Sequence, residues 1–174
     1  MNLEGWFFLS AALLLVSGGA KLADPAPTSG ALRGAGFASG RGLVYLLGAA
    51  ELAAGGWSLL AGGTGAGWAV AILYAGFGWF VALAIRRRLP IASCGCFGKI
   101  DTPPSTVHLI LNTAGVVGGI WAAANRSPSL VAVLGDQPLS GLPYLVFLAA
   151  GTYAAFLLLT ALPPLLAPHA AGPS

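Results

Sequence analysis

The stretch WAVAILYAGFGWFVALAI, residues 68–85, contains no charged side chain and is followed at once by Arg86, Arg87 and Arg88. A helix needs about 20 consecutive apolar residues to cross the hydrocarbon core of a bilayer. The apolar residues follow one another without the alternation of a membrane β-strand, so they favour a helix. This stretch therefore predicts a transmembrane α-helix that ends in a cluster of positive charge.

The rest of the chain has the same character. Apolar residues make up 57% of it and charged residues only 7%, whereas a soluble domain carries about 25% charged residues. Eight basic residues in all do not form a nucleic-acid-binding surface, and they lie mostly in the predicted loops. We therefore predict an all-α integral membrane protein with a single membrane domain. The further spans are predicted at 3–22, 43–61, 107–124 and, as a fifth helix, 139–162.

The ends of these spans and the loops between them carry weaker signals. The first span has Glu4 but no lysine or arginine ahead of it, so we expect a retained helix rather than a cleaved signal peptide. Residues 24–40, rich in Pro, Gly, Ala and Ser, are expected to be irregular, and residues 127–138 to form a short loop. Ser105 follows two prolines and is expected to cap the next helix. The tail after Pro163 is expected to fray.

The positive charges predict an orientation in the membrane. Seven of the eight lie at or near the connections between spans one and two and between spans three and four: Lys21, Arg33, Arg41, Arg86, Arg87, Arg88 and Lys99. Only Arg126 lies on the opposite side. Since loops with excess lysine and arginine face the cytoplasm, we expect the loop at 89–105 to be cytoplasmic.

That loop contains the two cysteines of the chain, in Ser93-Cys94-Gly95-Cys96-Phe97-Gly98. A disulfide between residues i and i+2 closes a small, strained ring, which the glycine between them eases. Strained disulfides are easily reduced, so the pair favours thiol–disulfide exchange over a structural cross-link. Positive charge from Arg88 and Lys99 would favour the reactive thiolate.

Two other interpretations of the cysteines, a buried residue without chemistry and a metal ligand, have less support in the sequence. Cysteine is often a small buried residue without chemistry. A metal site would need further ligands, and the chain offers only His108 and His169, so we predict no metal.

Three polar residues within the spans are further candidates. Glu51 lies in the middle of the second span, where an ionisable group is costly and faces the interior of a bundle. It could relay protons or contact a bound quinone-type ligand, or it could make an interhelical hydrogen bond that fixes packing. His108 and Asn112 share one face of the fourth span with Gly115 and Gly119, whose GxxxG spacing allows close helix packing. The two polar residues could likewise assist proton transfer or bond across the packing face. Lys21 is expected to extend to the lipid headgroups.

Several of these motifs resemble the MauE family, which is related to the DoxX-like membrane proteins. Residues 19–25, GAKLADP, are similar, with slightly looser spacing, to a Gly-x-x-Lys-Leu-x-Asp-Pro pattern at the end of that family's first helix. The Cys-Gly-Cys-Phe-Gly run, Glu51 and Asn112 match its other characteristic residues, although Leu111 stands where many members have arginine. The resemblance covers residues 3–124.

The resemblance implies a DoxX-like bundle of four core helices over residues 1–124, with the fifth helix and a tail in residues 125–174. It implies a membrane thiol–disulfide redox protein that works with a thioredoxin-like partner in a bacterial cytoplasmic membrane. In the namesake system the client is the disulfide-rich small subunit of methylamine dehydrogenase. That maturation role favours the outer side, in conflict with the charge-based orientation. The alternative is a non-catalytic assembly or export partner whose basic loop docks another protein.

Overall fold

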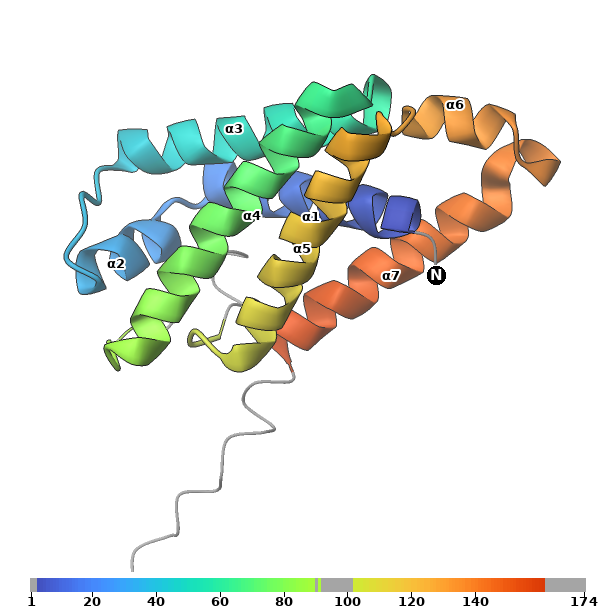
Figure 1. The fold of residues 1–174 in the computed structure, drawn as a ribbon. Helices are drawn as coiled ribbons and strands as arrows, with labels where there is room; N and C mark the ends of the chain where they lie inside the picture. The colour runs from blue at the N-terminus through green and yellow to red at the C-terminus, as the bar shows by residue number, and fades with distance from the viewer. Residues whose placement is uncertain (1–2, 90, 92–101, 162–174) are drawn as a thin grey trace, which may run out of the picture.

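Helices make up nearly all of the chain that the structure, a computed structural model, describes, namely residues 3–89, 91 and 102–161 (Figure 1). The elements in order are α1 (Leu3–Ala23), α2 (Ala26–Gly34), α3 (Arg41–Leu60), α4 (Gly63–Arg86), α5 (Thr106–Asn125), α6 (Leu130–Gly135), the 3-10 helix η2 (Pro138–Gly141) and α7 (Leu142–Thr160). Five of them, α1, α3, α4, α5 and α7, are long and apolar enough to cross a membrane. The predicted all-α integral membrane fold is confirmed.

Two of the predicted loops contain helices, so the predictions for 24–40 and 127–138 are wrong. Helix α2 begins directly after Pro25 and has a second proline in its first turn, where the missing N–H costs nothing. The Asp24 side chain accepts a hydrogen bond from the Ala26 N–H at 3.1 Å. Helix α6 begins after Ser129, whose Oγ accepts from the Ala132 N–H at 3.2 Å. Proline and serine therefore start helices here rather than preventing them.

Helices α4 and α5 pack side by side through glycine (Figure 1). A Cβ added to Gly119 would lie 2.7 Å from the Ala71 nitrogen and 2.8 Å from the Gly67 oxygen. A Cβ added to Gly115 would lie 2.6 Å from the Tyr74 ring. All three distances are too short for a real Cβ contact, so the predicted use of Gly115 and Gly119 in close packing is confirmed.

Helices α1 and α3 form the second close pair, and α1 passes behind α4 and α5 in Figure 1. A Cβ on Gly18 would lie 2.7 Å from the Gly48 oxygen, and a Cβ on Gly48 would lie 3.0 Å from the Gly18 oxygen. Lys21 and Glu51 follow these glycines by three residues each, on the same helix faces. The glycine contact therefore brings the two ionisable side chains together.

The cysteine loop connects α4 to α5 at one end of the bundle. This end, called the loop end below, also holds the C-termini of α1 and α7 and the N-terminus of α3. Its described parts are tied down, because Thr102 Oγ1 donates to the Leu159 oxygen at 2.8 Å and Ile91 is buried with Ala31 and Ala84. The loop that carries the predicted chemistry thus starts and finishes on packed helices.

Candidate functional site

The thiol pair and its nearest predicted cation, Cys94, Cys96 and Lys99, lie outside the described residues. Their predicted roles therefore stay predictions. Before them in the chain, Arg88 is exposed and in the left-handed region at φ 49°, just past the end of α4. After them, the described chain resumes at Thr102. The site can be built from the bundle side, where the other predicted residues lie.

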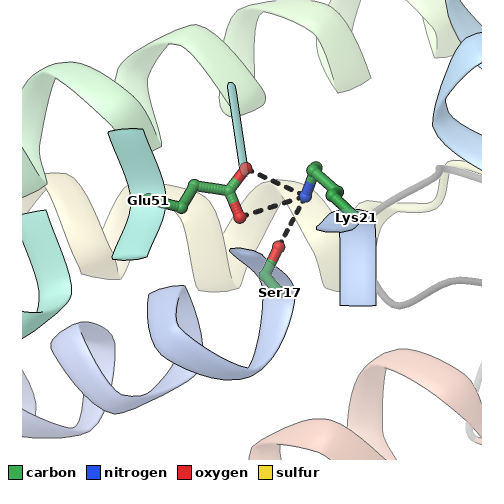
Figure 2. A network of polar contacts seen from close by, with 3 residues as sticks. All are labelled: Ser17, Lys21 and Glu51. Carbon is green, nitrogen blue, oxygen red and sulfur yellow. Dashed lines mark hydrogen bonds and ion pairs between the residues drawn. The ribbon is translucent and has the colours of Figure 1, made fainter. Parts of the chain in front are cut away.

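Glu51 is completely buried and is paired with Lys21 (Figure 2). Lys21 Nζ lies 2.9 Å from Oε1 and 3.1 Å from Oε2 of Glu51. Only the contact to Oε2 has the alignment of a hydrogen bond. The ammonium also donates to Ser17 Oγ, one turn earlier in α1, at 2.7 Å. The carboxylate and its cation thus form one compact polar group inside the bundle.

The prediction that Lys21 extends to the headgroups is wrong, since its side chain is only 3% exposed. A long lysine reaches the membrane surface because an unpaired charge in hydrocarbon is costly. Here Glu51 supplies the opposite charge at 2.9 Å, so burial no longer leaves a net charge in the core. The interhelical contact expected for Glu51 is present, in the form of an ion pair between α1 and α3.

His108 and Asn112 are both buried, one turn apart on α5. The Ser105 Oγ lies 2.9 Å from His108 Nδ1, so the serine binds the imidazole. Ser105 does occupy the N-cap position, but its side chain makes no capping bond to the backbone, and that part of the prediction is wrong. Asn112 Nδ2 donates to the His108 carbonyl at 2.8 Å, a bond within α5 and not across the packing face as expected. Ser105 therefore contacts the imidazole itself, whereas Asn112 contacts only the backbone carbonyl of His108.

A small cavity of about 40 Å³ lies between this histidine and Ser17, the serine that accepts a hydrogen bond from Lys21. Its polar lining comes from three helices: Ser17 of α1, Tyr74 of α4, and His108 and Asn112 of α5. The Tyr74 hydroxyl donates to the Ser10 carbonyl at 2.9 Å. Because Ser17 both lines the cavity and accepts from Lys21, Glu51 is connected through Lys21 and Ser17 to His108 and Asn112, while the rest of the cavity lining apart from Tyr74 is apolar.

The roles of Lys21, Ser17 and Tyr74 were missed from the sequence. One signal for Lys21 is present, because Gly18-x-x-Lys21 and Gly48-x-x-Glu51 have the same spacing of a small residue and an opposite charge. Two helices that cross at such glycines bring the charged residues face to face. No comparable sequence signal marks Ser17 or Tyr74. Within the described ranges, no three His, Cys, Asp or Glu side chains group as metal ligands would.

Comparison with known proteins assigns the chain to a family. The family profile described as Methylamine utilisation protein MauE matches residues 5–125. The match runs from the first turn of α1 to the last residue of α5, and it includes the ion pair, the Cys-Gly-Cys run and His108. No curated protein and no solved structure matches the chain. Since the profile covers well over half of the sequence, the chain belongs to the MauE family of membrane proteins associated with methylamine utilisation.

Proposed function

We propose that this protein carries out thiol–disulfide exchange at a membrane surface, with Cys94 and Cys96 as the reacting pair and a thioredoxin-like protein as partner. One observation carries the proposal. The only two cysteines of the chain form a Cys-Gly-Cys run, which is joined to the end of the bundle where α5 begins beside His108 and α1 ends beside Lys21.

The exchange follows ordinary thiol chemistry. One cysteine thiolate attacks a disulfide of the partner, forms a mixed disulfide and releases one partner thiolate. The second cysteine then attacks the mixed disulfide, which leaves an intramolecular disulfide here and a dithiol on the partner. In the opposite direction, a partner dithiol reduces the Cys94–Cys96 disulfide by the same steps. Arg88 and Lys99 favour the thiolate form by their positive charge.

The polar region inside the bundle supports proton transfer to and from these thiols. His108 is bound by Ser105 at the start of α5, and the 40 Å³ cavity behind it has room for a few water molecules. Ser17 continues from that cavity to Lys21 and Glu51. These groups supply donors and acceptors in sequence from the loop end into the bundle.

Trapping of the mixed disulfide tests the proposal. Cys94→Ser and Cys96→Ser variants, purified in nanodiscs, are each mixed with an oxidised thioredoxin. We expect one of the two variants to accumulate a covalent complex on a non-reducing gel, because the resolving thiol is missing. The double Cys→Ser variant is the control and should form none. Absence of a complex with both single variants would contradict the exchange reaction.

A second candidate function rests on the basic cluster. Arg86, Arg87 and Arg88 are all exposed at the end of α4, so they form a surface on which an acidic protein could dock. In this alternative the protein assembles or exports a partner without redox chemistry. Reversing these three charges to glutamate would then abolish function, while the double Cys→Ser variant would retain it. The exchange reaction predicts loss of function in the double variant.

The client and the side of the membrane belong to the same proposal. By family, the client is a disulfide-rich subunit such as the small subunit of methylamine dehydrogenase, and the membrane is the bacterial cytoplasmic membrane. Since Lys21 is buried in an ion pair, it no longer counts among the loop charges. The remaining cations still favour a cytoplasmic cysteine loop. A cytoplasmic loop fits best if the Cys94–Cys96 disulfide accepts electrons from a dithiol partner in the cytoplasm.

A further inference from the structure

A cavity of about 450 Å³ lies between α2, α3 and α4 at the loop end of the bundle. This volume is within the range of small-molecule binding sites in proteins. Its lining is almost wholly apolar, with aromatic side chains from the α2–α3 connection and from α4: Phe37, Phe77, Trp79 and Phe80. Lys21 and Thr28, both buried, are its polar lining residues.

The mouth of the cavity faces lipid. Three residues of its lining, Leu43, Ile72 and Trp79, are strongly exposed and lie on helices that span the membrane, with Ile72 67% exposed. Among the residues that the structure describes, no charged side chain other than Lys21 lines the cavity. A ligand would therefore enter from the bilayer, and it would carry an apolar tail that remains among the lipid chains.

The inner wall of the cavity, where Lys21 lies beside Glu51, selects against an anionic ligand. Lys21 Nζ lies 2.9 Å from the Glu51 carboxylate, so the two side chains carry no net charge together. A phosphate or carboxylate headgroup would add an uncompensated negative charge beside that carboxylate. A neutral group with carbonyl oxygens avoids this cost, and its oxygens can lie toward the positive side of the ion pair, because only Lys21 of the pair lines the cavity. A bare acyl chain has no dipole to place there.

The aromatic lining favours a flat ring. Phe37 lies with its ring centroid 5.7 Å from that of Trp79 and 6.3 Å from that of Phe80, and Lys21 Nζ lies 5.5 Å from the centroid of Phe77. Planar conjugated rings pack well against such side chains. The ligand that combines a neutral flat ring, carbonyl oxygens and an apolar tail is a lipid-soluble quinone.

We infer that this cavity binds the head ring of a membrane quinone, with its isoprenoid tail leaving between Leu43 and Ile72. The choice of a quinone among neutral planar ligands rests on the proposed thiol chemistry. Oxidation of the Cys94–Cys96 dithiol to a disulfide releases two electrons and two protons, and a quinone that takes up both becomes a quinol. The cavity therefore supplies the membrane-side redox partner that thiol–disulfide exchange needs to turn over.

Photolabelling tests the site. The purified protein in phosphatidylcholine nanodiscs is irradiated with a decyl-tailed azidobenzoquinone, and labelled peptides are mapped by mass spectrometry. We expect saturable labelling of α2 and α4 that an excess of the same quinone without the azide displaces. Gly76→Leu should weaken the labelling by about tenfold or more, because Gly76 lines the cavity and a Cβ there meets nothing within 4 Å. Gly56→Leu is the matched control, since Gly56 has the same free space but does not line the cavity.

A second variant, Ile72→Trp, fills the exposed mouth and should also weaken labelling, so the test does not depend on the folding of one protein. Labelling that rises linearly with probe concentration, or that is equal in the Gly76 and Gly56 variants, would overturn the inference. So would displacement by oleate or phosphatidic acid but not by quinone. Labelling requires no thiol, so the two proposals can fail separately. Saturable labelling without a trapped disulfide complex overturns the exchange reaction alone. A trapped complex without saturable labelling overturns the quinone site alone.

Discussion

Replacing Lys21 with methionine would leave the Glu51 carboxylate buried without its cation. Methionine keeps the length of the lysine side chain but removes the charge. Nζ and Oε1 are 2.9 Å apart, and at an effective dielectric constant of 20 two unit charges at that distance attract by about 6 kcal/mol. Burial costs each ion several kcal/mol of hydration, so the intact pair contributes little net stability. Removal of one partner forfeits the attraction and keeps the hydration cost, which destabilises proteins by about 3–5 kcal/mol.

The measurement is a double-mutant cycle on the free energy of unfolding. Lys21→Met, Glu51→Met and the double variant are unfolded reversibly in mixed micelles, and helix content is followed by circular dichroism. We expect each single variant to lose about 3–5 kcal/mol and the double variant to lose much less than their sum, because it contains no unpaired charge. Arg33→Met, at an exposed cation whose contact to Ser39 is 3.5 Å long, is the control and should change stability by less than about 0.5 kcal/mol.

The outcome that would refute this reasoning is specific. If both single variants lost less than about 1 kcal/mol and the losses added, the pair would behave like an exposed ion pair in water. The inner wall of the large cavity would then be hydrated, and the argument that a neutral ion pair selects a neutral ligand would fail. A double variant as unstable as the two singles combined would likewise show that Lys21 and Glu51 act independently.

Three further predictions concern packing and orientation. Gly119→Ala should destabilise the bundle by about 1–3 kcal/mol in the same unfolding assay, because its Cβ would meet the α4 backbone at 2.7 Å, whereas Gly56→Ala should cost nothing. Thr102→Val removes the 2.8 Å hydrogen bond to Leu159 and should lower stability by about 1 kcal/mol, measured in that assay against Thr102→Ser. A membrane-impermeant maleimide should modify the thiol pair in inverted vesicles and not in intact cells; labelling from outside alone would contradict the cytoplasmic loop.

The membrane spans could be predicted from the sequence because the apolar length of a segment is a local property. All five predicted spans coincide with long helices, although α4 begins at Gly63 rather than at residue 68. The wrong predictions concern the connections between spans. Residues 24–40 contain α2 because Pro25 and Pro27 fit the start of a helix as well as they fit a loop, and composition does not distinguish the two.

The polar residues of the site also divide into those that the sequence identifies and those that only the structure identifies. Glu51, His108 and Asn112 could be selected because ionisable and amide groups are rare within membrane spans. Their partners could not. Lys21 at the end of a span is equally consistent with a headgroup contact, and Ser105 beside a helix start is equally consistent with a backbone cap.

The sequence by itself thus determined the class of protein, the number of spans and the family to which the Cys-Gly-Cys run belongs, because these depend on local composition and on a short motif. Only the tertiary structure decided that Lys21 pairs with Glu51, that the region of the ion pair meets that of His108 at one small cavity, and that a larger cavity opens beside them toward lipid. The physical reason is the helix crossing. The contact of Gly18 with Gly48 sets the distance and rotation of α1 against α3, and only that geometry turns two costly charges into a neutral pair.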